Sequence, residues 1–132
     1  MGTVVLYERI RNVRLSPAKA SLDGRSFRVV ATAVEGEADA ATVFEYHEHD
    51  GFIWARYAGG AVRLGFLVGT REGECLDFRY SQLDGNGETS SGHCSTTIST
   101  LADGRLRLDE DWAWESKSGA GTSAVEEIAG AG

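Results

Sequence analysis

Residues 52–69, FIWARYAGGAVRLGFLVG, contain two alternating runs of side chains with a Gly59-Gly60 pair between them. This pattern predicts two antiparallel strands joined by a two-residue turn. Side chains alternate across a strand, so the turn defines a predicted inner face of Ile53, Ala55, Tyr57, Val62, Leu64 and Phe66, followed by Val68. The predicted outer face carries Arg56 beside Arg63, and Trp54 opposite Gly65.

Similar runs, separated by Asp-Gly and other turn dipeptides, continue along the chain. They predict strands near 25–34, 42–49, 52–58, 61–70, 74–83, 88–100, 105–116 and 122–128. Eight antiparallel strands in sequence order favour an all-β, up-and-down β-barrel, because closure leaves no exposed sheet edge. An open sandwich is the alternative.

The length of 132 residues indicates one domain. We expect an N-terminal arm or a ninth strand within residues 1–24, with residues 3–9 as the candidate strand. The barrel is expected over 25–128, followed by a disordered tail at 129–132.

The chain has a formal net charge of −7. This charge argues against nucleic acid or an anionic membrane as a partner and favours a small neutral or cationic ligand. The start, MGTVVLYERIRNVRLS, lacks the apolar core and cleavage site of a signal peptide. We therefore expect a cytoplasmic protein whose two cysteines are reduced.

The inner face can be carried from strand to strand through the turns. Backwards from the glycine pair it includes Phe44, Tyr46 and Glu48. Forwards it is predicted to include Leu76, Phe78, Tyr80, Gln82, Thr89, Ser91, His93, Ser95, Thr97, Leu106, Leu108, Glu110, Trp112 and Trp114. A β-bulge would reverse the assignment from that point onward. For the last strand, Ser123, Val125 and Glu127 are as suitable as Ala124, Glu126 and Ile128.

Many of these inner residues are polar or aromatic, whereas a barrel filled for stability alone would use aliphatic side chains. The pattern therefore predicts a ligand cavity. Its candidate binding residues are Tyr46, Tyr57, Tyr80, Gln82, Ser95, Glu110, Trp112 and Trp114. The structural alternative is that Glu110 accepts hydrogen bonds that fix barrel closure while the tryptophans plug one end.

The same residues suit acid–base catalysis. Burial would raise the pKa of the Glu110 carboxyl group, so that Glu110 or His93 could act as acid or base while Tyr80 or Tyr57 orients the substrate. We expect no cofactor and no metal site, since His47 and His49 lie on the predicted outer face beside a charged turn.

From about residue 25 to 128 the chain resembles a family of short bacterial proteins. The resemblance rests on FEYHEHDGFIWARYAGGAVRLGFLVG, DFRYSQLDGNGETSSGHCSTT and LADGRLRLDEDWAWES. The resemblance implies a calycin-type barrel, similar to lipocalins and avidins. Members often carry the label N-acetylglutamate synthase. No Gly-rich loop leads into a helix here, as acetyl-CoA binding would require, so an acetyltransferase is not expected.

Three functions follow as hypotheses. The first is a small-molecule-binding barrel, and the second is a barrel enzyme for isomerisation or cyclisation. The third is a homodimer that uses Trp54, Arg56 and Arg63 as its interface. Cys75 and Cys94 are both predicted to face outward, which argues against a catalytic dithiol.

Overall fold

The computed structural model describes residues 20–32 and 37–129. They form eight strands: β1 (Ser26–Thr32), β2 (Val43–His49), β3 (Phe52–Gly59), β4 (Val62–Glu72), β5 (Cys75–Asp84), β6 (Thr89–Thr100), β7 (Leu106–Trp114) and β8 (Ala120–Glu127). No helix within the described residues has the length and apolar character needed to cross a membrane.

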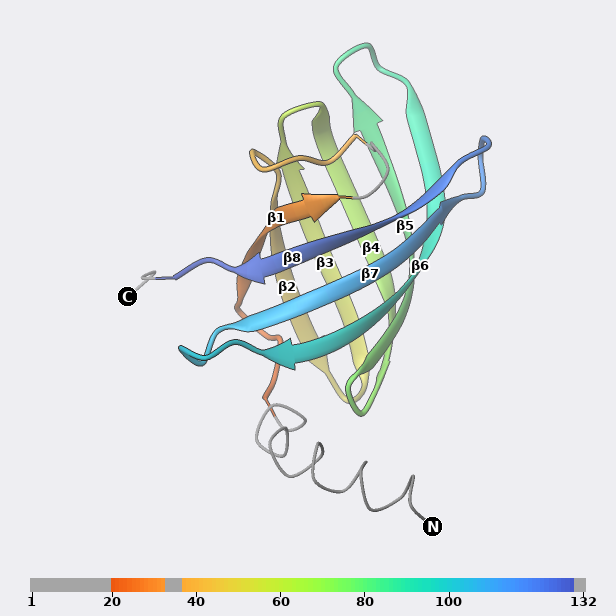
Figure 1. Cartoon of the computed structure of the whole chain (residues 1–132). Helices are drawn as coiled ribbons and strands as arrows, with labels where there is room; N and C mark the ends of the chain where they lie inside the picture. The colour runs from red at the N-terminus through yellow and green to blue at the C-terminus, as the bar shows by residue number, and fades with distance from the viewer. Residues whose placement is uncertain (1–19, 33–36, 130–132) are drawn as a thin grey trace.

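Each strand pairs antiparallel with its neighbour in sequence, and β1 pairs with β8 to close the sheet (Figure 1). The predicted up-and-down barrel is confirmed, and the open sandwich is excluded. The candidate strand at 3–9, most of the arm at 1–24 and most of the tail at 129–132 lie outside the described residues.

One end of the barrel is plugged by the segment that precedes β1. Leu22 is fully buried there and belongs to the apolar core cluster of the barrel. Glu48 holds the segment in place, because its Oε1 accepts hydrogen bonds from the Leu22 backbone N–H and from Arg71 Nη1, each at 2.8 Å. Arg71 Nη1 also donates to the Ala20 carbonyl, at 2.7 Å. We call this the plugged end.

The opposite end, the loop end, carries the β1–β2, β3–β4, β5–β6 and β7–β8 connections (Figure 1). Its turns use left-handed glycines where the chain reverses, including Gly60 at φ 62° between β3 and β4. Such a backbone angle is open to glycine and strained for most other residues.

The predicted inner face of β4 is wrong because β4 contains a bulge. Its register shifts by one residue against β5 between Val62 and Leu64, and against β3 between Val62 and Gly65, so β4 contains one extra residue at Arg63. Leu67 is therefore buried, whereas Phe66 and Val68 are 55% and 66% exposed. A bulge adds one residue to one strand only, so it reverses the alternation beyond it.

The β5 face is nevertheless as predicted, because a second irregularity cancels the first. The β4–β5 hairpin turns on two residues, Gly73 and Glu74, and pairs Glu72 with Cys75. A three-residue loop at 71–73 was expected from the sequence. Leu76, Phe78 and Gln82 are buried accordingly.

The predicted face of β6 is also wrong. Leu83 pairs with Thr89 across a five-residue loop, 84–88. The inner face is consequently Ser90, Gly92, Cys94, Thr96 and Ile98, rather than Thr89, Ser91, His93, Ser95 and Thr97. The next loop, 101–105, has five residues where a turn on Asp103-Gly104 was expected, and it returns β7 to its predicted face.

These registers settle two open questions. On β8, Val125 lies opposite Leu108 and is fully buried, and Ser123 lies opposite Glu110, so these two residues face the interior. The cysteines lie on opposite faces of the sheet, because Cys75 is exposed and Cys94 is buried. The prediction that both face outward is wrong for Cys94.

Candidate ligand-binding site

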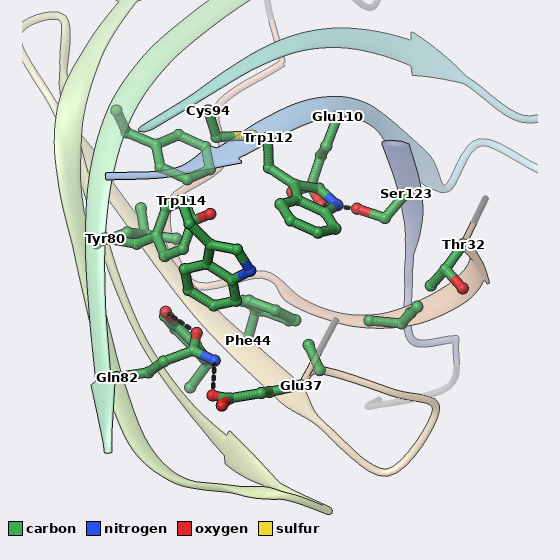
Figure 2. A pocket seen from close by; sticks show the side chains of 15 residues that line it. Thr32, Glu37, Phe44, Tyr80, Gln82, Cys94, Glu110, Trp112, Trp114 and Ser123 are labelled. Carbon is green, nitrogen blue, oxygen red and sulfur yellow. Dashed lines mark hydrogen bonds between the residues drawn. The ribbon is translucent and has the colours of Figure 1, made fainter. Parts of the chain in front are cut away.

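A cavity of about 70 Å³ lies inside the barrel, and Glu37 of the β1–β2 connection lines one side of it (Figure 2). A single water needs on the order of 10–15 Å³ of such space. The cavity therefore has room for several waters or for the head group of an organic molecule. Drug-sized pockets are larger, at roughly 300–1,000 Å³.

Six aromatic rings line the cavity: Phe44, Tyr57, Phe78, Tyr80, Trp112 and Trp114. Phe44 and Tyr57 stack with ring centroids 4.6 Å apart. The other four form a continuous arc, with centroid separations of 6.3 Å, 5.6 Å and 5.7 Å along it. These contacts fix the rings against one another, so the wall is built before any ligand binds.

Glycines on the neighbouring strands make room for three of these rings. Tyr57 lies opposite Gly65, Phe78 opposite Gly69, and Tyr80 opposite Gly92. A Cβ atom at any of the three glycines would overlap the facing residue. The predicted pairing of Gly65 with Trp54 on the outer face is wrong. The β4 bulge places Gly65 on the inner face, opposite Tyr57.

Glu110 places a carboxyl group with a raised pKa in the cavity. It projects from β7, is half-buried, and accepts a 2.8 Å hydrogen bond at Oε1 from Ser123 Oγ. Burial raises the pKa of its carboxyl group to about 7, Asp109 adds to the rise, and the Ser123 hydrogen bond opposes it. Near neutral pH Glu110 can therefore either donate or accept a proton.

A hydrogen-bonded chain crosses the cavity wall from Tyr57 to the β1–β2 connection. The Tyr57 hydroxyl donates to Gln82 Oε1 at 2.8 Å, and Gln82 Nε2 donates to Glu37 Oε1 at 2.7 Å (Figure 2). Burial raises the pKa of the Tyr57 phenol, so this hydroxyl remains a donor. Lys117 Nζ lies 3.5 Å from Glu37 Oε2.

Tyr46 is buried but does not line the cavity. Its hydroxyl has no hydrogen-bond partner among the described residues. Burial raises the pKa of this phenol, and Glu110, Cys94 and Tyr57 raise it further. All three of these neighbours line the cavity, so the unpaired hydroxyl lies close to it. A buried polar group without a partner is costly, and a polar ligand atom or a water would relieve the cost.

His93 and Ser95 are not in the cavity. Both face outward on β6, where His93 Nε2 lies 2.6 Å from Asp77 Oδ1 and Ser95 is exposed. The predicted acid–base role of His93 and the predicted binding role of Ser95 required an inward face, which the five-residue loop before β6 reverses. Cys94 takes the inward position instead, and burial raises the pKa of its thiol.

The remaining predicted residues do meet at one place. Tyr57, Tyr80, Gln82, Glu110, Trp112 and Trp114 all line the cavity. Sequence reasoning missed Glu37 and Ser123. Glu37 lies in a connection, where alternation gives no orientation, and Ser123 belongs to the strand whose face was left open.

No cluster of three or more metal-ligating side chains occurs in the described part of the chain. His47 and His49 lie on the outer face of β2. His47 stacks on Trp54, with ring centroids 5.5 Å apart. His49 Nε2 lies 3.4 Å from Asp50 Oδ2.

Comparison with protein families gives one match, to the family described as avidin-like protein, over residues 20–128. Comparison with curated proteins and with solved structures gives no match. The matched range begins just before Leu22, at the plugged end, and runs through the last strand of the barrel. It agrees with the calycin-type barrel that the resemblance implied. The chain belongs to the avidin-like protein family.

Proposed function

We propose that this barrel binds a small molecule in its interior cavity. The observation that carries the proposal is that Glu110 lines a cavity whose wall also contains six aromatic rings. Burying a carboxyl group is costly, and stability alone would be served by an aliphatic side chain. Membership of the avidin-like family and the unpaired Tyr46 hydroxyl support the same reading.

The two parts of the cavity suit the two parts of one ligand. The arc of rings would contact its apolar portion, while Glu110 at one side and the Gln82–Glu37 pair at the other would contact polar atoms. Ligand pockets commonly combine an apolar lining with a few fixed polar groups that set orientation. The small volume favours a compact ligand, or a head group whose remainder extends past the loop end.

Native mass spectrometry of the purified protein tests the proposal. Ser123→Phe would fill the cavity from β8, and Thr122→Phe adds the same ring on the exposed face one residue away. We expect a bound small molecule on the wild type, after purification from cells or incubation with cell extract. The Thr122→Phe protein should retain it and the Ser123→Phe protein should not. A folded wild type that carries no ligand under either condition would contradict the proposal.

A second candidate function is acid–base catalysis in the same cavity. It is favoured by the pKa of about 7 for Glu110, which suits proton transfer at neutral pH. The Glu110 carboxylate would remove a proton from a substrate carbon, and the resulting acid would return it at another position, giving an isomer. In Glu110→Gln the bound molecule should remain while its conversion stops. Unchanged conversion would exclude this function.

We also propose a homodimer through the outer face of β3 and β4. Phe52, Trp54, Phe66 and Val68 are 43–66% exposed there. Trp54 pairs directly with Val68, and Arg56 with Phe66, so the apolar side chains are contiguous. Exposed apolar patches of this kind commonly mark protein contacts. Arg56 and Arg63 are also exposed.

A further inference from the structure

The charged groups that line the cavity are all acidic. Among the described residues that line the cavity, Glu37 and Glu110 carry the carboxyl groups, and none is Lys, Arg or His. The whole chain carries a net charge of −7. An anionic ligand would meet two carboxyl groups, of which, within the described chain, only Glu37 has a cation nearby, Lys117 Nζ at 3.5 Å. The net negative field of the protein would also oppose its approach.

The aromatic wall is suited to a cation. The face of an aromatic ring is negative, and a positive group within about 6 Å of its centroid is attracted to it. The protein already contains one such contact, since Lys117 Nζ lies 4.5 Å from the centroid of the Trp114 ring. Lys117 is not among the cavity-lining residues, and its side chain is 46% exposed. The contact shows that an ammonium group can sit on this ring while it is paired with Glu37.

We propose that the ligand carries an organic ammonium head group, methylated on nitrogen, which the cavity encloses between Tyr57, Tyr80, Trp112 and Trp114 with Glu110 and Glu37 as counter-charges. This inference rests on the proposed binding function and names its ligand class. Methylation is favoured by the six ring faces that line the cavity. An unmethylated ammonium needs three acceptors, whereas a quaternary one needs only ring faces and nearby negative charge.

The cavity volume agrees with a head group rather than a whole large ligand. At about 70 Å³ the space is well below that of a drug-sized pocket. A compact trimethylammonium group would fill it, and a longer substituent would leave through the loop end. The methyl groups would contact Trp112 and Trp114 from β7 and Tyr80 from β5 (Figure 2), and Tyr57 from β3.

The test compares choline with 3,3-dimethylbutan-1-ol, a neutral molecule of almost the same shape in which carbon replaces the charged nitrogen. Binding is measured by isothermal titration calorimetry and by the fluorescence of Trp112 and Trp114 in a Trp54→Phe background. We expect choline to bind at least about tenfold more tightly than the neutral alcohol, a difference of roughly 1.4 kcal/mol. 3,3-Dimethylbutanoate, the anionic analogue, should bind more weakly than either.

Two pairs of variants locate the binding. Glu110→Gln and Trp114→Leu should each weaken choline binding about tenfold or more, on the scale expected for a desolvated cation contact. Glu45→Gln and Trp54→Leu make the same chemical changes on the outer face of β2 and β3 and should leave affinity within about twofold. If circular dichroism shows that Glu110→Gln folds poorly, Glu37→Gln removes the other carboxylate of the cavity and should also weaken choline binding.

The outcomes separate this inference from the proposed function. Equal affinity for choline and the neutral alcohol would overturn the cation proposal and leave the binding function standing, as would a neutral or anionic molecule found by native mass spectrometry. Absence of choline binding to folded wild-type protein would also overturn it. Both the cation proposal and the binding function would be contradicted only if no molecule bound to the cavity in any of these experiments.

Discussion

Tyr57 lies directly opposite Gly65 across the β3–β4 ladder, and its ring covers the position that a side chain at residue 65 would occupy. The same ring stacks on Phe44, and its hydroxyl donates to Gln82. One glycine therefore permits both the aromatic wall and the hydrogen-bonded chain that reaches Glu37. Its replacement should affect fold and cavity together.

We expect Gly65→Ala to lower the free energy of unfolding by roughly 1–3 kcal/mol, because the methyl group would overpack a filled interior. Gly85→Ala is the matched control. Residue 85 has open space around it and no left-handed backbone angle, so its replacement should cost less than about 0.5 kcal/mol. Urea unfolding of both variants measures the difference. Equal stability of the two would show that Tyr57 has room to move.

Glu48→Gln should destabilise the plugged end. The change removes the charge that lies 2.8 Å from Arg71 Nη1, in a pair whose side chains are only 7% and 18% exposed. Loss of this largely buried charge contact should cost more than about 1 kcal/mol, the upper limit for an exposed pair. Glu45→Gln on the same strand affects an exposed pair with Arg56, 3.8 Å apart, and should cost below about 1 kcal/mol. Similar unfolding midpoints for both variants would contradict this account.

The raised pKa of Glu110 makes stability depend on pH. Its carboxyl group has a pKa of about 7 in the folded protein against an ordinary value of 4.5. Between these values the folded state keeps a proton that the unfolded state has lost, so stability falls as pH rises and levels off above about 7. The contribution that disappears is up to about 3 kcal/mol.

The measurement is the difference in free energy of unfolding between wild type and Glu110→Gln at pH 4.5, 6 and 7.5. Taking the difference removes the contribution of the other titrating groups. Relative to the variant, the wild type should lose stability across this range. A constant difference would mean that the folded and unfolded states ionise Glu110 alike.

The strand boundaries followed closely from the sequence because turn dipeptides and alternating runs are local signals. The faces of β4 and β6 did not follow, because each depends on a single residue in a bulge or a loop. The loop before β6 is an example. Asp84 Oδ1 accepts hydrogen bonds from the backbone of Asn86 and Glu88, and Gly87 adopts φ 82°. These contacts set a five-residue loop, a length that the turn dipeptides at 84–87 do not specify.

Much of the cavity was predictable even so, because the irregularities occur in pairs. The β4 bulge reverses which side chains face inward, and the short hairpin after it reverses them back. The two long loops around β6 cancel in the same way. Tyr80 and Trp112 therefore face the interior as expected, whereas His93, between the second pair of irregularities, faces out. The position of Glu37 could not be predicted, since no periodicity orients a side chain in a connection.

The proposed dimer predicts a change of mass in solution. Multi-angle light scattering of the wild type should give twice the mass of one chain at micromolar concentration, and Trp54→Ala should give the monomer mass. Trp54 is 43% exposed on the outer face, so its loss should leave thermal stability almost unchanged. A monomeric wild type at all concentrations would exclude the dimer.

Cys75 begins β5 directly after the hairpin on Gly73 and Glu74, at the end remote from the cavity, and its thiol is exposed while that of Cys94 is enclosed. A maleimide reagent should therefore label the chain at one position. Protein coupled to a sensor chip through this sulfur would present its loop end to the flowing sample. The native sequence thus already contains an oriented attachment point for screening compounds, with no engineered tag near the opening.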